Sequence, residues 1–388
     1  MHVGMATGFA NHLRVDDARF MREELVQCML AEELGFDSLW ITEHHFCDYS
    51  MSPDPLMTLS WLAGRTRHIR LGTQVIVAPW HDPVRLAEQI LMLDHLSGGR
   101  AIIGFGRGLA RDEYEGLRVD QSKARELFDE IVALVMTALE TGFIEGGAHF
   151  KQPRRALRPR PLRSLSGRAF AGGGTPASMV AAAKLGLGRL FLNQPMTTSR
   201  QRPPFGGGSA SAQPQAVPVD PTAGAMNDDW LEAWHKARPG ETPPSPFVSN
   251  LVFVDDSADR AHELARTYAA NTFRAAIEHY ELTSDHHGTV KGYEAYQALK
   301  MKPDDVEKAV EGVVQSSIYG TPQQVLEKHE AVKKLRKPQG FFPHLWTGGM
   351  PHGEAMRNTR FFAAHCLPEL KSWTAEPSTI GEPLRSAA

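Results

Sequence analysis

The sequence lacks the features that mark several common classes of protein. Its three cysteines are odd in number and far apart, which excludes a disulfide framework or a zinc knuckle and favours a reducing compartment. No apolar run approaches the roughly 18 residues of a membrane span, and the first residues lack the basic and then apolar segments of a secretion signal. The net charge of −3 comes without a block of one sign, so neither nucleic acid nor an anionic membrane is indicated as a partner. These observations predict a soluble, cytoplasmic protein.

What the sequence does contain is a regular alternation of short apolar segments with segments of helical spacing. Such alternation is typical of parallel strands joined by right-handed crossovers. The apolar segments do not alternate strictly with polar residues, as expected when both faces of a sheet are buried. Eight strands favour a closed (β/α)8 barrel, an α/β fold, over an open doubly wound sheet. We predict them at residues 2–9, 38–44, 69–77, 100–106, 168–175, 188–193, 249–256 and 340–347.

Two segments interrupt this pattern within what we interpret as one barrel domain, residues 1–370, followed by a tail, 371–388. Residues 195–248 are rich in proline and glycine and are predicted to be an insertion with one short helix at 227–238. Loops of this length are usually excursions near an active site or disordered segments. Residues 283–303 are polar with interspersed aromatics and follow a long helical stretch, so we predict a mobile lid there.

The stretch ITEHHF, residues 41–46, places Glu43, His44 and His45 at the end of the second predicted strand. In a (β/α)8 barrel, the catalytic side chains come from the carboxyl ends of strands and the loops that follow them. Adjacent side chains on a strand point in opposite directions, so His44 and His45 are not expected to share a metal ion, and we predict no metal site. His44 then faces the mouth and suits proton transfer. His45 and Glu43 are assigned structural roles, with a barrel arginine as the expected partner of Glu43.

Two further strand ends carry polar groups. Arg107 follows the fourth predicted strand, and the glycines 172–174 follow the fifth and lead into a helix with Thr175 and Ser178 in its first turn. Glycines before a helix N-terminus allow close backbone approach and favour a bound anion, for which Arg107 offers a counter-charge. A tight turn without a ligand is the alternative interpretation. No Walker motif or G-x-G-x-x-G motif is present.

The sequence resembles the bacterial luciferase-like, flavin-dependent monooxygenases in several ordered blocks. These are FDSLWITEHHF, VIVAPWHDPVRLAEQILMLDHLSGGR, IIGFGRGL, GTPQQVLEK and FFPHLWTGGMPHGEAMRNTRFFAAHCLPEL. The likeness covers residues 1–195 and 249–370. It implies a (β/α)8 barrel, usually a homodimer, that binds reduced FMN supplied by a separate flavin reductase.

The resemblance also implies roles for particular residues. His44 matches the family's catalytic histidine, and Glu113 stands where light-emitting members carry its aspartate partner, with Asp112 as the neighbouring alternative. Gly106 stands where those members carry a cysteine, so light emission is not expected. The residues that match contacts to the flavin phosphate are Arg107, Gly174, Thr175, Ser178 and, as an addition, Arg125. Three side chains at the predicted mouth contact either the substrate or only the barrel rim: Trp80, His81 and Trp346.

The implied function is that of a two-component monooxygenase. It would use reduced FMN and O2, through a peroxyflavin, to insert one oxygen atom into a small organic substrate such as an aldehyde or ketone, with His44 as general acid/base. One alternative keeps the fold and transfers a hydride with a deazaflavin, and O2 consumption distinguishes the two. The other alternative is a flavin-binding protein without catalytic activity, against which the intact E-H-H motif argues.

Overall fold

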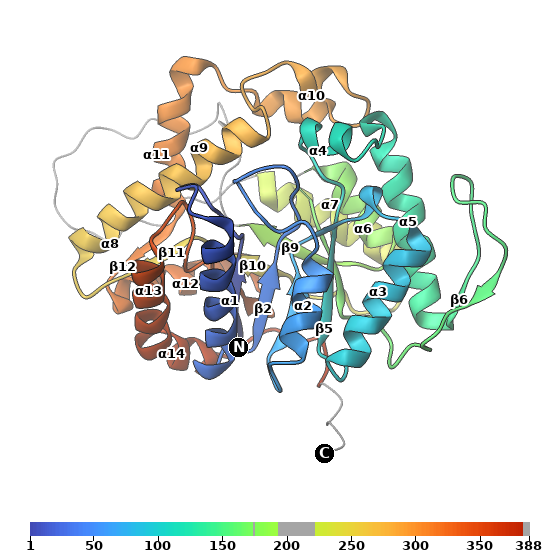
Figure 1. Cartoon of the computed structure of the whole chain (residues 1–388), viewed down its shortest axis with the longest axis horizontal. Helices are drawn as coiled ribbons and strands as arrows, with labels where there is room; N and C mark the ends of the chain where they lie inside the picture. The colour runs from blue at the N-terminus through green and yellow to red at the C-terminus, as the bar shows by residue number, and fades with distance from the viewer. Residues whose placement is uncertain (174, 193–221, 383–388) are drawn as a thin grey trace.

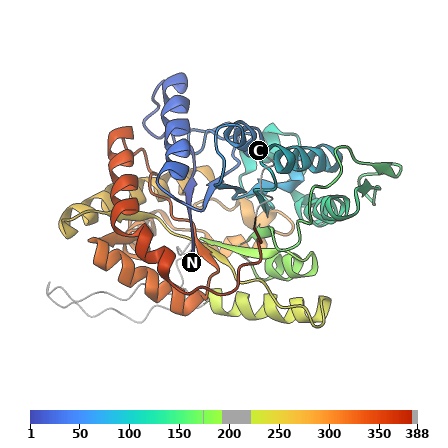
Figure 2. The same cartoon turned by 90° about the horizontal axis from the view of Figure 1, so that it is seen from below.

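Eight parallel strands form a closed barrel in the computed structural model, which describes residues 1–173, 175–192 and 222–382. Each barrel strand is hydrogen-bonded to the barrel strand that follows it in the chain, and the last strand pairs with the first. Helices surround the strands on the outside (Figures 1 and 2). The predicted (β/α)8 fold is therefore confirmed. In order, the barrel strands are β1 (His2–Thr7), β2 (Ser38–Ile41), β3 (Arg70–Thr73), β5 (Ala101–Gly106), β8 (Ala169–Gly172), β9 (Gly188–Leu192), β10 (Phe247–Ser249) and β13 (Gly340–Phe341).

The helices between the strands begin at recognisable local signals. An aspartate or threonine side chain caps the first turn and a proline follows it in four of them, because proline has no N–H to lose at that position. These four are α2 (Pro55–Ala63), α3 (Pro83–Leu96), α6 (Pro176–Lys184) and α12 (Pro322–Arg336). The other long helices are α1 (Asp17–Glu33), α5 (Ala124–Thr141), α7 (Thr222–Ala237), α11 (Val306–Ser316) and α13 (His352–His365).

The barrel interior is a packed core. Trp40 of β2 stacks on Phe342 and tilts against Phe247, and all three side chains are buried. Each fully buried side chain of this size contributes roughly 1.5–3 kcal/mol to folding. Ile380, from the C-terminal segment, joins the same cluster. Ile380, which falls in the stretch 371–388 predicted to be a tail, therefore belongs to the barrel core.

The strand predicted at 249–256 is two separate elements. Strand β10 ends at Ser249, and β11 (Val252–Val254) pairs outside the barrel with β12 (Ile318–Gly320), which the sequence pattern did not reveal. Strand β10 begins at Phe247, inside the predicted insertion, and α7 packs against α6. Residues 222–248 thus continue the barrel pattern, whereas residues 195–221 of the predicted insertion lie outside the described residues.

A long helical stretch leads into the predicted lid. Helix α8 (Ala258–Leu264), a π-helical turn η3 (Ala265–Ala269) and α9 (Ala270–His279) follow one another without a break. The predicted lid then contains α10 (His286–Thr289) and the 3-10 helix η4 (Glu294–Leu299). Figure 1 shows α10 near α4 (Arg111–Gly116), and hydrogen bonds of His286 to Gln121 and of Lys291 to Glu126 tie the segment to that side of the barrel.

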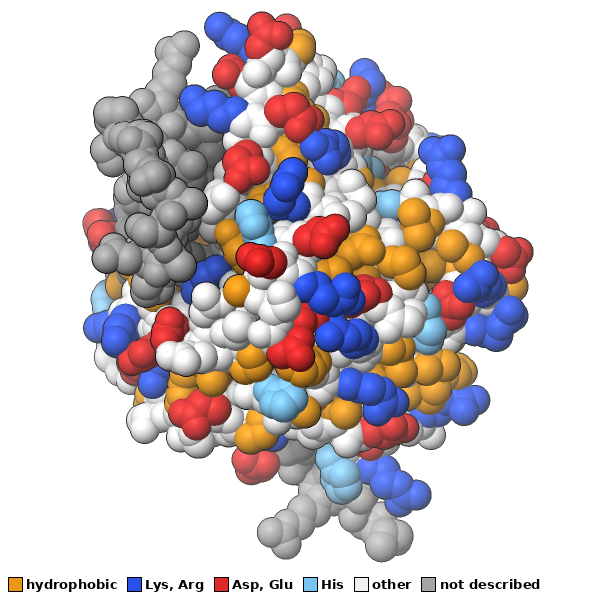
Figure 3. All heavy atoms as spheres, turned by 90° about the vertical axis from the view of Figure 1, so that its left-hand side faces the viewer, with side chains coloured by type: hydrophobic (Ala, Val, Ile, Leu, Met, Phe, Trp, Pro, Cys, Tyr) orange, Lys and Arg blue, Asp and Glu red, His pale blue; other side chains and the backbone are white. Residues whose placement is uncertain are grey.

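Within the described helices, no apolar stretch is long enough to cross a membrane. On the face that Figure 3 shows, the described acidic and basic side chains are interspersed.

Candidate functional site

The E-H-H stretch lies in the loop that follows β2, at the carboxyl end of the barrel strands. His44 Nδ1 is 3.0 Å from Glu113 Oε1, and the backbone N–H of His45 donates to the same oxygen at 2.8 Å. Glu113 lies in the first turn of α4, directly after β5. The structure therefore brings together the predicted pair of His44 and Glu113, which are 69 residues apart in the chain.

The Glu113 carboxyl is only 1% exposed. Burial would raise its pKa, but hydrogen bonds and charge from His279 and His44 outweigh burial and lower the pKa to about 2. An ionised carboxylate only accepts hydrogen bonds, so the proton between it and His44 sits on Nδ1 of the imidazole. This leaves Nε2 of His44 as the nitrogen that faces away from Glu113.

Glu43 is the centre of a second buried cluster. Its carboxylate lies 2.8 Å from His81 Nε2 and 3.3 Å from His45 Nε2, and it accepts the backbone N–H of Val77 at 2.7 Å. The prediction of an arginine partner is wrong, because two histidines fill that place. Burial acts against the charge, but the hydrogen bonds of His45 and His81 lower the pKa of Glu43. His45 thus has the structural contact that was expected of it.

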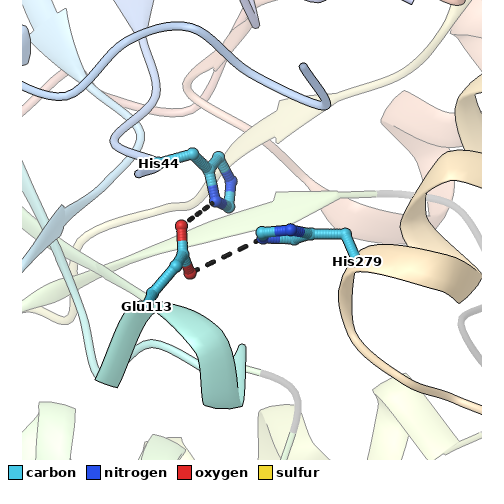
Figure 4. Close-up of side chains that lie close together, drawn as sticks. All are labelled: His44, Glu113 and His279. Atoms are coloured by element: carbon cyan, nitrogen blue, oxygen red, sulfur yellow. Dashed lines mark hydrogen bonds and ion pairs between the residues drawn. The ribbon is translucent and has the colours of Figure 1, made fainter. Parts of the chain in front are cut away.

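Two residues at the end of α9 complete the surroundings of His44. His279 Nε2 is 3.5 Å from Glu113 Oε2, and the hydroxyl of Tyr280 is 3.4 Å from His44 Nε2 (Figure 4). Neither residue was predicted from the sequence. Their helix was recognised, but nothing in the local pattern shows that its last turn reaches a glutamate 166 positions earlier.

His44, Glu113 and His279 offer ligand atoms that lie within 4.8 Å of one another, so a cation is a rival for this position. His44 and Glu113 are already joined directly, and the shared oxygen also accepts the His45 N–H. The contacts are therefore those of a hydrogen-bonded pair, and the expectation of no metal site stays a prediction.

Positive charge and hydroxyl groups gather at the neighbouring strand ends. Arg125 donates to Ser178 Oγ at 2.7 Å, and the hydroxyls of Ser178 and Thr175 are 2.9 Å apart at the start of α6. Arg107 donates to the carbonyl of Gly292 at 2.6 Å, and Gly292 also lies beside Arg125. Within the described part of the chain, no carboxylate lies within ion-pair distance of Arg107. Gly174 lies outside the described residues.

The three candidates for substrate contact have different surroundings. His81 is held by Glu43, and the indole N–H of Trp346 donates to both oxygens of Glu24 at 2.8–2.9 Å, so both side chains are engaged within the protein. Trp80 lies edge-on to His45, 5.3 Å between ring centroids, and among the described residues its buried N–H has no partner. Of the three side chains, Trp80 is therefore the one whose N–H is available to a ligand.

Gly106 is explained by its neighbour Val75. A Cβ at position 106 would lie 2.2 Å from Val75 Cγ2, so any side chain there clashes. A Val75 methyl group, just after β3, thus occupies the space that the side chain of a cysteine at position 106 would need.

A family model described as luciferase-like monooxygenase matches residues 1–336. The chain belongs to the luciferase-like monooxygenase family. The resemblance drawn from the sequence blocks is therefore confirmed.

Individual proteins show how far the likeness extends. The oxygenase component of the flavin-dependent trigonelline monooxygenase of Acinetobacter baylyi is 30% identical over 161 residues, 40% of this chain and 45% of that protein. The monooxygenase RslO1 of Streptomyces bottropensis is 25% identical, with a TM-score of 0.70 over 95% of this chain and 99% of that one. The oxygenating constituent of 3,6-diketocamphane monooxygenase of Pseudomonas putida shares the fold, with 16% identity, a TM-score of 0.69 and coverage of 95% and 99%.

The sequence alignments with three curated relatives cover 42%, 45% and 47% of those proteins, so the chain spans less than half of their length. The family and fold of this chain follow from the comparisons. Its substrate, cofactor and partners are matters of proposal.

Proposed function

We propose that this protein is the oxygenase of a two-component monooxygenase that uses reduced FMN and O2 to insert one oxygen atom into a small organic substrate, such as an aldehyde or ketone. The observation that carries the proposal is the placement of the His44–Glu113 pair and the Arg107, Arg125 and Ser178 group at neighbouring strand ends of the barrel. One group suits proton transfer and the other suits a phosphate.

The donor set fits the phosphate of FMN. The Arg125 guanidinium donates to the Ser178 hydroxyl in the first turn of α6, beside the Thr175 hydroxyl, and the Arg107 guanidinium lies next to Arg125 at Gly292. A phosphate is the anion that such donors bind best. Buried donors without partners among the described residues, Trp80 Nε1 and Gln74 Nε2, are further candidates to contact the ring system. When bound, reduced FMN would supply two electrons and activate O2 for transfer of one oxygen atom.

The protein's own part in the reaction follows from its geometry. Arg107, Arg125, Thr175 and Ser178 would hold the cofactor's phosphate. His44, with its Nδ1–H fixed on Glu113, presents Nε2 to accept or return a proton beside the reacting atoms. The predicted lid, which contacts Arg107 through Gly292, excludes water from the mouth when it closes.

The proposal includes two partners. The relative from Acinetobacter baylyi is named as an oxygenase component, which supports a separate flavin reductase for this protein as well. A homodimer is supported by large apolar side chains that the neighbouring helices α2 and α3 expose, and sedimentation of the purified protein at micromolar concentration measures it. These side chains are Met57, Trp61, Met92 and Leu96.

The decisive experiment supplies chemically reduced FMN to the protein in air and screens aldehydes, ketones and sulfur compounds for oxygenated products. Product formation, labelled by 18O2, is the readout, because free reduced FMN consumes O2 without any enzyme. We expect one labelled oxygen atom per product molecule, and the same mixture without protein is the control. Hydride transfer to a substrate from a reduced deazaflavin, with no O2 consumed, would replace this proposal by its alternative.

A further inference from the structure

His279 has the surroundings of a functional group rather than of a packing residue. Its side chain is 7% exposed, its ring stacks on Tyr49 at 4.8 Å between centroids, and it meets the ring of His44 edge-on at 5.0 Å. It approaches the oxygen of Glu113 that His44 does not contact. Figure 4 shows the carboxylate between the two imidazoles, each contributed by a different element.

One buried carboxylate cannot balance two imidazolium rings in contact, so at most one of the two histidines carries a positive charge. The nearby groups are accounted for as follows. Arg111 of α4 is paired with Glu281, Asp48 with Arg14, and His45 with Glu43. The remaining groups that face the pair are the thiol of Cys47 and the hydroxyls of Tyr49 and Tyr280.

The surroundings of His279 shift its pKa. Burial lowers the pKa of this imidazole, but its contacts with Cys47 and Glu113 outweigh burial and raise the pKa to about 9. His279 also has the geometry for the charged partner, because its Nε2 lies 3.5 Å from the Glu113 oxygen that His44 does not contact.

We propose that His279 is a positioning residue that supplies the positive charge opposite Glu113, so that His44 is kept as a neutral imidazole with Nδ1 protonated and Nε2 free to accept a proton. The proposal rests on the proposed function only in one respect, namely that the proton accepted by His44 is the one transferred in the monooxygenase reaction. With His279 in place, the charge of Glu113 is already balanced by His279, so protonation of His44 is stabilised little. Without it, the buried carboxylate would take its counter-charge from His44, and the base would be lost.

The test reads the charge of each ring directly, in flavin-free protein, from the ring 15N chemical shifts of labelled histidines at pH 7.5. In the wild type we expect His44 to be neutral with the proton on Nδ1, and His279 to be an imidazolium. His279→Gln should turn His44 into an imidazolium, and His279→Lys, which restores the charge, should return it to neutral. His286→Gln, a histidine of the predicted lid bonded to Gln121, is the matched control and should change neither ring.

A second readout follows turnover against pH. In His279→Gln the acidic limb of the kcat profile should move upward by about one pH unit or more, while KM for the substrate stays within a factor of two or so of wild type. A structural residue would lower kcat at every pH alike. The proposal is overturned if the wild type carries its charge on His44, or if His279→Gln leaves His44 neutral. It is also overturned if Zn²⁺ binds stoichiometrically and shifts both rings. Since the wild-type spectrum needs neither flavin nor substrate, it stands or falls independently of the proposed monooxygenase activity.

Discussion

At the scale of single residues, the two adjacent histidines bind different carboxylates. His44 contacts Glu113 and His45 contacts Glu43, although β2 ends at Ile41 and both lie in the loop beyond it. The predicted division between them therefore cannot rest on strand alternation, and it rests instead on their partners. His45 shares a buried anion with His81 and the Val77 N–H, whereas His44 keeps one nitrogen free of any carboxylate.

This division predicts opposite outcomes for two alanine variants. His44→Ala should keep FMN affinity and melting temperature, because Glu113 retains His279 and the His45 N–H. It should lose about a hundredfold in turnover and release hydrogen peroxide in place of product. His45→Ala should lower the free energy of unfolding by about 1–3 kcal/mol, because a buried acceptor loses a partner. Denaturant unfolding and product-to-peroxide ratios measure both, and a stable but inactive His45→Ala beside a fully coupled His44→Ala would reverse the assignment.

Arg107 carries the prediction for the cofactor. Since its guanidinium has no carboxylate partner among the described residues, we expect the FMN phosphate to fill that place. FMN should then bind much more tightly than riboflavin, and Arg107→Ala should cost about 2–5 kcal/mol of FMN binding with no loss of riboflavin binding. Arg118→Ala, an arginine outside this group, serves as the control. Equal affinity of the wild type for FMN and riboflavin, measured by fluorescence titration, would contradict the assignment of Arg107 to the FMN phosphate.

At the scale of elements, the predicted lid, 283–303, is joined to the site at two points. His287 Nε2 is 2.7 Å from the carbonyl of Tyr280, which contacts His44, while Tyr293 packs under the Arg107 guanidinium at 3.9 Å. We predict that amide hydrogen exchange in this segment is faster in the ligand-free protein and slows when reduced FMN is added, because a phosphate bound at Arg107 would add to the apolar contact of Tyr293 with Leu109 and Tyr114. Exchange in α12, on another side of the barrel, should not change. Strong protection without any ligand would instead make 283–303 a fixed segment.

The elements also show what could be predicted from the sequence and what could not. The barrel strands and most helices were predictable because each is a local pattern, an apolar run or a capped start such as Asp82 followed by Pro83. Strand β12 was missed because three residues between two helices, Ile318–Gly320, carry no pattern of their own and are ordered by pairing with β11. His279 was missed for the same reason, because its role comes from a contact with Glu113 that only the folded chain creates. Glu113 itself was found through the family resemblance.

At the scale of the whole molecule, the two ends of the barrel have separate tasks. The candidate site lies at the carboxyl ends of the strands, whereas the C-terminal segment crosses the opposite end. There Thr379 donates to Gly167 and to Gln339, which precede β8 and β13, and Arg70 at the start of β3 donates to the carbonyl of Gly381. Ile380 lies between these contacts, 3% exposed, in the cluster of Trp40, Phe247 and Phe342.

We therefore predict that the C-terminal segment stabilises the barrel without taking part in the chemistry. Ile380→Ala should lower the free energy of unfolding by about 2–5 kcal/mol, because the cavity it leaves is lined by large rings that cannot collapse into it. Removal of residues 374–388 should cost at least as much, since it also breaks the bonds of Thr379. FMN affinity, measured well below the melting temperature, should stay unchanged in both, because none of the contacts of residues 374–382 reaches Arg107 or His44. Glu376→Ala, at an exposed position of the same segment, controls for changes of sequence alone.

Two outcomes would contradict this prediction. Unfolding of Ile380→Ala at the same denaturant concentration as the wild type would show that the cluster does not need Ile380. A parallel loss of FMN affinity would show that the two ends of the barrel are coupled.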